Sequence, residues 1–435
     1  MFKRLSKQEK AWVLYDLAES PYTITVMATI MGMYFLASAE AAIGDIVVAN
    51  AYWSFGTAAA IVFIGLLAPI IGTLTGYIGK KKLVFNLFVG LGVLATAGIA
   101  FVPEHMWFGL LFMYILSLIG YSGANKVYNA FLVDVSPNER MNRVSTFAFG
   151  VGYLGCVPPF LVSIAPILLI QLDIISMSMV TAYRIAFLIT AVWWIVLTIP
   201  MFRHVNQKYG APMESQYVRK SFVSVWLTFR EICKHKPVLL FLLAFFLYSD
   251  GLNSIVSLAT AFGVTIGIGQ VDLLLVLLVM QLVAGPCAII YGRMADKFGT
   301  KKTIYFGIGT YVVVCLIALL MNPARDVRFL TGLFWGLAML IGTAQGGIQA
   351  LSRAYFSKVV PKEKSNEFFG FYNVFGRLAS IIGTTLFGVI SLWTGQPHFG
   401  IAGIAVLFIL AAIIFKFVPD DKEISWEDKQ SSISV

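Results

Sequence analysis

The stretch GRMADKFGTKK, residues 292–302, and the stretch GTLTGYIGKKK, residues 72–82, share one pattern. Each follows a long apolar run, begins with glycine, has another glycine seven positions later and ends in two lysines. A second pair, PNERMNR from Pro137 and PKEKSNE from Pro361, repeats at nearly the same offset, 224 positions against 220. Two matches at one offset predict two homologous halves.

The composition is that of a polytopic membrane protein. Of the 435 residues, 59% are hydrophobic and 12% are charged, whereas soluble domains have about 25% charged residues. So few charges cannot cover a water-facing surface of this size. The net charge of +10 is typical of the basic cytoplasmic loops of membrane proteins, so we expect no nucleic-acid partner. The scattered cysteines and histidines show no metal-ligand spacing, and we expect no metal and no cofactor.

Twelve apolar runs are long enough to cross a membrane, since a spanning helix needs about 20 mostly apolar residues. Their approximate limits are 11–38, 50–77, 83–103, 105–134, 144–170, 182–202, 237–262, 271–292, 303–321, 328–354, 367–393 and 397–418. This pattern predicts an all-α membrane protein with twelve transmembrane helices in two pseudo-symmetric six-helix bundles. The predicted parts are an N-terminal bundle at 1–202, a linker at 203–236, a C-terminal bundle at 237–418 and a tail at 419–435.

Most of the lysines and arginines lie in alternate loops, while the opposite loops carry only Arg325 and Arg328. Because loops rich in these residues stay inside the cell, we predict that both termini and the linker are cytoplasmic. The linker contains SFVSVWLTFREICKHK, residues 221–236, with apolar residues at helical spacing. This spacing favours an amphipathic helix on the membrane surface, and an ordinary linker helix is an equally good interpretation.

A polar stripe runs along the first span of each half, at spacing i, i+3, i+4, i+7 on one helix face. The first stripe is Asp16, Glu19, Ser20 and Thr23, and the second is Asp250, Asn253, Ser254 and Ser257. An ionisable residue near the bilayer centre costs about 2.5–3.5 kcal/mol on insertion scales, so such residues face protein or a water-filled cavity. We therefore predict a central cavity between the two halves.

Other polar groups lie within predicted spans, and they complete the candidate substrate-binding or proton-binding residues. The full set is Tyr15, Asp16, Glu19, Lys126, Asn129, Asp250, Asn253, Gln345, Gln349, Asn373 and Arg377. Structural roles are the alternative: Asp16 as a helix-end residue, Arg377 as a partner of Glu367, and the glutamines as interhelical contacts. Lys126 is the hardest to explain structurally, because a single ammonium in mid-span needs a partner.

No sequence motif of a hydrolase, metalloprotease or nucleotide-binding loop is present. Parallel halves around a central site are a transporter architecture, so the chain is not expected to be an enzyme. The glycine- and proline-rich stretch GVGYLGCVPPF, residues 150–160, suits a helix that bends during gating. A static packing kink would have the same composition.

The stretch GRMADKFGTKK resembles the loop signature of the major facilitator superfamily. The matching positions are Gly292, Asp296, Lys297, Gly299, Lys301 and Lys302. The resemblance implies the major facilitator fold and a role for this loop in locking one conformation. In the first half Gly76 and Tyr77 stand where the signature has an aspartate and a basic residue.

The chain is more specifically similar to the vacuole-effluxer-like branch, which includes fungal vacuolar amino-acid exporters. The resemblance rests on WVLYDLAESPY, VYNAFLVDV, FGVGYLG, LLAFFLYSDGLNS and GGIQALSRAYFSKVVPKEKSNEFFGFYNVFGR. The last stretch contains Arg353, which we assign to conformational gating. The branch usually has asparagine at the position of Glu19 and no lysine at that of Lys126. We hypothesise that these two charges form an ion pair or bind a zwitterion.

The resemblance and the polar groups together predict a proton-coupled secondary transporter of a small polar or zwitterionic solute, such as an amino acid. Lys126 or Arg377 would meet a carboxylate, and Asp16, Glu19 or Asp250 an amine or a proton. The alternatives are a larger amphiphilic cargo, or a membrane receptor that transports nothing. Aromatic residues near the predicted cavity would suit the larger cargo: Tyr15, Tyr22, Trp53, Tyr121, Tyr128, Tyr153 and Tyr372. We expect a monomer in a bacterial cytoplasmic membrane, with a vacuolar membrane as the alternative.

Overall fold

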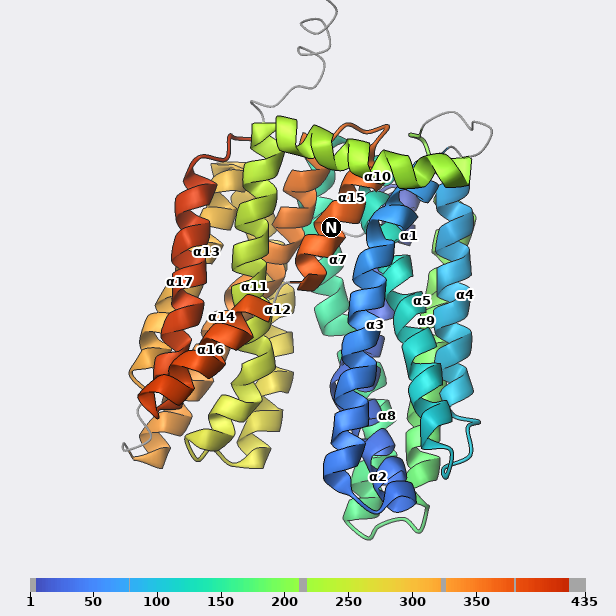
Figure 1. The fold of residues 1–435 in the computed structure, drawn as a ribbon, viewed down its shortest axis with the longest axis vertical. Helices are drawn as coiled ribbons and strands as arrows, with labels where there is room; N and C mark the ends of the chain where they lie inside the picture. The colour runs from blue at the N-terminus through green and yellow to red at the C-terminus, as the bar shows by residue number, and fades with distance from the viewer. Residues whose placement is uncertain (1–4, 78, 211–216, 322–325, 379–380, 422–435) are drawn as a thin grey trace, which may run out of the picture.

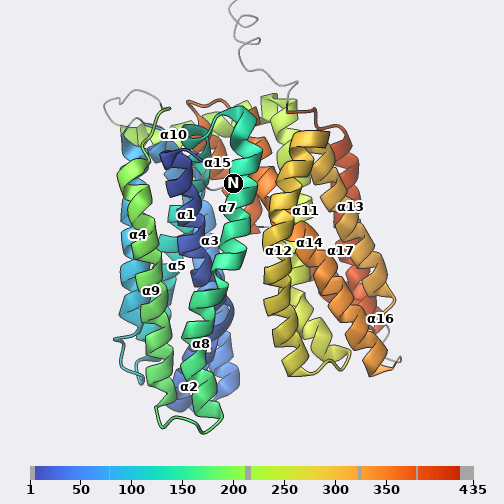
Figure 2. The same cartoon turned by 180° about the vertical axis from the view of Figure 1, so that it is seen from behind.

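The computed structural model describes residues 5–77, 79–210, 217–321, 326–378 and 381–421. The secondary-structure elements in these ranges are helices (Figures 1 and 2). The N-terminal half contains α1 (Lys7–Pro21), the π-helix η2 (Tyr22–Ile30), α2 (Met31–Ile43), α3 (Ile46–Thr75), α4 (Lys80–Ile99), α5 (Trp107–Ala130), α6 (Leu132–Val135), α7 (Asn138–Gly155), α8 (Val157–Gln171) and α9 (Met179–His204). After α10 (Tyr217–Lys234), the C-terminal half contains α11 (Lys236–Thr265), α12 (Gln270–Phe298), α13 (Thr300–Leu319), α14 (Val327–Val359), α15 (Ser365–Leu378), α16 (Ile381–Thr394) and α17 (Pro397–Lys416).

Eleven helical segments in the described ranges are long and apolar enough to cross a membrane. The predicted span 367–393 is the exception: α15 and α16 lie in it on either side of residues 379–380, which are outside the described ranges, and the described apolar helix Ile382–Thr394 is short. The other predicted spans each fall on one of the eleven segments. The all-helical membrane fold is therefore confirmed, and the number of twelve spans stays a prediction.

Each half is built around its own hydrophobic core. Buried aromatic side chains of α1, η2, α5 and α9, among them Trp12, Tyr22 and Trp194, lie in the first core. The second core contains Phe241, Tyr311 and many residues of α14. In Figure 1 the two groups of helices converge toward the end that carries α10 and diverge toward the other end. We call these the α10 end and the opposite end.

The first span begins with a capping box. The Ser6 hydroxyl accepts a hydrogen bond from the backbone of Glu9, whose carboxylate accepts one from the backbone of Ser6. The α-helical form ends at Pro21, and a π-helix follows. Proline has no backbone N–H to donate, so a change of helical form at this point has a direct cause.

Glycines allow the two halves to touch near the α10 end. A Cβ atom on Gly72 of α3 would lie 2.6 Å from the Asn366 carbonyl oxygen of α15, and one on Gly150 of α7 would lie 2.8 Å from the Gly285 carbonyl of α12. In the stretch predicted to bend, the helix is interrupted at Cys156 between α7 and α8. Here a Cβ on Gly155 would overlap Leu17 of α1. Close packing is therefore sufficient to explain Gly150 and Gly155.

Helix α10 lies across the α10 end and contacts both halves (Figure 1). Its Thr228 hydroxyl bonds to Glu367 of α15, and its Glu231 pairs with Lys364 at 2.8 Å. Trp226 and Leu227 are 66% and 55% exposed. This exposed apolar surface agrees with an amphipathic helix.

A buried ion pair joins α4 to α6. The Lys81 ammonium lies 2.5 Å from the Asp134 carboxylate, and both side chains are fully buried. The other carboxylate oxygen of Asp134 accepts hydrogen bonds from the backbone of Lys208 and Tyr209, at 2.7 and 3.0 Å. The sequence places Lys81 in a run of three lysines that is typical of a cytoplasmic loop, but in the structure its side chain lies in the protein interior.

Candidate functional site

An ion pair between the halves lies where α1, α7 and α14 meet. Arg353 of α14 donates to the Asp16 carboxylate of α1 at 3.3 Å. Only 4% of the arginine side chain and 8% of the aspartate side chain are exposed. Two oxygens of Ser145 on α7 accept from the same guanidinium, at 2.9 and 3.2 Å, and Asn129 of α5 accepts at 3.1 Å. One side chain of the C-terminal half is thus bound by three helices of the N-terminal half.

Aromatic rings surround the same guanidinium. Its central carbon lies 4.5 Å from the ring centres of Trp12 and Phe149 and 5.4 Å from that of Tyr128. Trp12 precedes Asp16 by four residues, and Ser145 precedes Phe149 by four, so each pair lies on one helix face. We call the six residues Trp12, Asp16, Tyr128, Asn129, Ser145 and Phe149 the arginine cage.

Glu19 and Lys126 have separate contacts. The Glu19 carboxylate accepts from the Asn125 amide at 3.0 Å, whereas the Lys126 ammonium donates to the Ile64 carbonyl of α3 at 2.6 Å. Neither contact joins the two charges directly. Consecutive residues of an α-helix point about 100° apart, so Asn125 faces α1 while Lys126 faces α3. A zwitterion bound by both charges would have to bridge these two directions.

Asp250, the leading residue of the second stripe, holds the start of α16. Its carboxylate accepts from the backbone N–H groups of Ile382 at 3.1 Å and Gly383 at 2.6 Å, and from the Ser254 hydroxyl at 3.2 Å. The side chain is fully buried. The first N–H groups of a helix have no partner within it, and Asp250 supplies this partner from another helix.

Replacement of Asp250 by alanine is expected to destabilise the C-terminal half. Two backbone N–H groups would lose their acceptor, which for a helix cap costs about 0.5–2 kcal/mol. Thermal unfolding of the purified protein in detergent should therefore begin at a lower temperature than in wild type. Asp250→Asn keeps an acceptor oxygen and should retain most of the stability. Equal unfolding of Asp250→Ala and wild type would contradict the capping role.

The signature loop also connects the halves at the α10 end. Arg143 of α7 forms an ion pair with Asp296 of α12. The Asn142 amide donates to the Thr300 hydroxyl at 3.0 Å, and Thr300 donates to Asp421 at 2.9 Å. Gly299 has a φ of +97°, a conformation that side chains rarely adopt. The loop thus contacts the N-terminal half directly.

Asp421 ties the end of the second half to this loop. Its carboxylate lies 2.6 Å from the Lys358 ammonium of α14. Partial burial raises the pKa of Asp421, but side-chain hydrogen bonding with Asp420 and Thr300 and the charge of Lys358 lower it by more, so the net pKa lies below the usual value. The group therefore remains a carboxylate at neutral pH.

The remaining candidate residues are more dispersed. Tyr15 packs against Phe85 and Tyr128 inside the N-terminal half, and Asn373 donates to the Phe369 carbonyl within its own helix, at 2.6 Å. Asn253, Gln345 and Gln349 are partly buried on α11 and α14, Gly292 approaches Thr146 of α7, and Lys297 lies over Phe298. Arg377 lies in α15, but its side chain is outside the described part of the structure.

Sequence reasoning missed three members of the arginine cage, Trp12, Ser145 and Phe149, and assigned a fourth, Tyr128, only to a larger cargo. Their chain positions carried a usable signal, since Trp12 and Asp16 lie one helical turn apart, as do Ser145 and Phe149. Of the aromatic residues assigned to a larger cargo, Tyr15, Tyr22 and Tyr128 are fully buried in the first core. They offer no open surface in this conformation.

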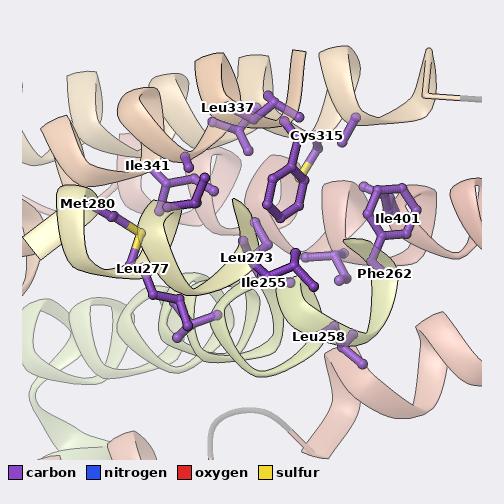
Figure 3. Close-up of a pocket in the computed structure, with 18 of the residues that line it drawn as sticks. Ile255, Leu258, Phe262, Leu273, Leu277, Met280, Cys315, Leu337, Ile341 and Ile401 are labelled. Carbon is purple, nitrogen blue, oxygen red and sulfur yellow. The ribbon is translucent and has the colours of Figure 1, made fainter. Parts of the chain in front are cut away.

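A separate apolar cavity lies inside the C-terminal half (Figure 3). Its lining includes Phe262, Leu277, Met280, Cys315 and Ile341, and it carries almost no polar surface. Charged solutes need polar or charged partners when they leave water. This cavity therefore does not suit an amino acid or another ion.

Comparison with known proteins identifies a family and a fold. The family model described as "Vacuole effluxer Atg22 like" matches residues 5–426. The MFS-type transporter YxiO of Bacillus subtilis is 43% identical over the full length of both chains. Autophagy-related protein 22-2 of Aspergillus niger is 25% identical over 66% of this chain, which spans about half (52%) of that relative.

Solved structures with a similar fold have low sequence identity. The proton:xylose symporter XylE, of the major facilitator superfamily, superimposes with a TM-score of 0.69 at 14% identity and covers 98% of each chain. A bacterial homologue of the iron transporter ferroportin in an outward-facing state gives a TM-score of 0.68 at 14% identity, over 94% of this chain and 98% of that one. At such identity the likeness concerns the fold alone.

Proposed function

Because the chain belongs to the vacuole effluxer Atg22-like family of major facilitator transporters, we propose that it moves a small polar or zwitterionic solute, such as an amino acid, by proton-coupled alternating access. The single observation that carries this proposal is the buried Asp16–Arg353 pair between the halves. A buried ion pair is weak evidence for stability but well suited to a switch. Its breakage would release α14 from α1 and α7.

The polar groups of α1 and α5 support a solute site in the N-terminal half. Glu19 and Lys126 are intramembrane charges of opposite sign, on helices that contact each other through the Asn125 hydrogen bond. In our proposal Glu19 meets the amine or the proton, and Lys126 meets the carboxylate. Asp250 has a different role, because α16 already occupies its carboxylate oxygens.

The proton part can be tested in proteoliposomes. We expect an imposed pH gradient to accelerate the flux of at least one radiolabelled amino acid, and Glu19→Gln to abolish the dependence on the gradient, because an amide cannot take up a proton. Glu40→Gln is the matched control, since Glu40 is exposed on α2 of the same first span. Flux that ignores the gradient in the wild type would refute proton coupling.

We also propose a membrane topology. Helices α15 and α16 together would count as one span, which gives twelve, and the α10 end would face the cytoplasm because the basic loops gather there. In this orientation the conformation is closed toward the cytoplasm. A cysteine at Glu139 should react with a membrane-impermeant maleimide only after the cell membrane is opened. Labelling of intact cells at this position would reverse the orientation.

A further inference from the structure

We infer that the arginine cage is itself a binding site for the primary ammonium or guanidinium group of the solute, and that Arg353 fills it only while the α10 end is closed. The inference rests on the proposed alternating access and specifies its substrate class: solutes with a cationic group. The cage then has two alternative occupants, the arginine of α14 and a free cation.

The first argument is that the cage belongs entirely to one half. Its residues come from α1, α5 and α7, whereas Arg353 comes from α14. Contacts inside the N-terminal half hold its walls: the Trp12 indole donates to the Tyr128 carbonyl at 3.0 Å, and their rings stack at 4.6 Å. These contacts do not involve α14, so the cage should keep its shape when Arg353 leaves.

The second argument is chemical. The cage combines one carboxylate, an amide oxygen, a hydroxyl and a backbone carbonyl with three aromatic faces. Aromatic rings around acceptor oxygens are a recognised arrangement for organic cations. Without Arg353, Asp16 would be left without its arginine counter-charge, and a cation of the same charge is the group that restores balance.

The third argument is the direction of the polar stripe. One turn further from the α10 end, Glu19 lies next to Asn125, and one turn beyond that, Thr23 lies 2.9 Å from the Tyr121 hydroxyl. A cation displaced from the cage by Arg353 therefore meets a second carboxylate deeper in the same helix. Closure of the α10 end and transfer of the solute inward become one event.

The experiment measures opening of the α10 end directly. The four cysteines are replaced by alanine, and spin labels are attached at Glu139→Cys on α7 and Lys302→Cys on α13, both exposed and outside the cage. Pulsed electron paramagnetic resonance then measures the distance between the two labels, one on each half. The probes are methylguanidinium and ethylammonium chloride, with sodium chloride at equal ionic strength and neutral methylurea as controls.

Opposite effects are expected in two backgrounds. With Arg353 present, the cations compete with it for the cage and increase the fraction of molecules in which the two spin labels are far apart. In Arg353→Ala, they fill the empty cage, neutralise Asp16 and increase the short-distance fraction. If Trp12→Leu is added to Arg353→Ala, the methylguanidinium concentration that gives half of the maximal closure should rise by about tenfold. This factor corresponds to the loss of one desolvated cation–π contact. The inference would be overturned if methylurea or sodium chloride changed the distance distribution as much as the cations do. It would also be overturned if the cations shifted the distances in the same direction with and without Arg353.

Failure of the inference and failure of the proposed function are distinguishable. If no condition or variant produces a long distance, alternating access is wrong, and thermal stabilisation of Arg353→Ala by methylguanidinium over sodium chloride still decides whether the cage binds cations. If the long distance occurs but does not respond to either cation, the cage inference is wrong and alternating access stands. If Arg353→Ala cannot be purified, the response with Arg353 present decides.

Discussion

Replacement of Arg353 by alanine should hold the protein open at the α10 end and abolish solute flux. The change leaves Asp16 without its arginine partner inside the closed interface. Removal of one partner of a buried ion pair costs about 3–5 kcal/mol, and each 1.4 kcal/mol is about a tenfold change in an equilibrium. The ratio of closed to open molecules should fall by at least about a hundredfold. Spin labels at positions 139 and 302 would measure it.

Two further variants separate charge from geometry. Arg353→Lys keeps the charge but loses the planar fork that reaches Asp16, Asn129 and Ser145 together, so closure should be only partly restored. The double variant Asp16→Ala, Arg353→Ala removes both charges and should close more readily than Arg353→Ala alone. A closed interface in Arg353→Ala would show that the ion pair does not control this end.

Replacement of Asp134 by alanine should produce the largest loss of stability. Lys81 would remain fully buried without a counter-charge, and the backbone of Lys208 and Tyr209 would lose its acceptor. The expected decrease in the free energy of unfolding is about 3–5 kcal/mol, measured by chemical denaturation in mixed micelles. The double variant Lys81→Met, Asp134→Leu should recover part of this loss.

Lys82 provides the matched control for the buried pair. It is the next residue in the chain, but its ammonium donates to the Asn206 side chain at an exposed site, at 2.8 Å. Lys82→Ala should change the stability by at most about 1 kcal/mol, as is usual for exposed polar contacts. Similar losses for Lys82→Ala and Asp134→Ala would mean that burial of the Lys81–Asp134 pair does not determine the stability.

The family and the membrane fold could be predicted from the sequence, because both depend on patterns along the chain. The apolar runs define the spans, and GRMADKFGTKK and the long stretch around Arg353 carry the family resemblance. Asp16 and Arg353 were both among the candidate residues, but in different roles. Their contact joins positions 337 residues apart, and no local periodicity reports such a distance.

The contacts of Asp250 and Lys126 show what a single helix face cannot report. The backbone groups that donate to Asp250 belong to α16, 132 and 133 residues further along the chain. For Lys126, the helical period alone places it about 100° from Asn125. Asn125 is the residue whose amide bonds to Glu19, and the pairing of Glu19 with Lys126 stays a prediction.

The linker contacts have a consequence for biosynthesis. Asp134 and Lys81 are made early, yet Asp134 accepts from Lys208 and Tyr209, and Gln207 bonds to the backbone of Gly79. A ribosome has to translate beyond α9 before these partners exist. Until then the nascent first half holds a carboxylate whose final hydrogen bonds are missing. Maturation of the first half therefore requires docking of the linker segment that follows α9.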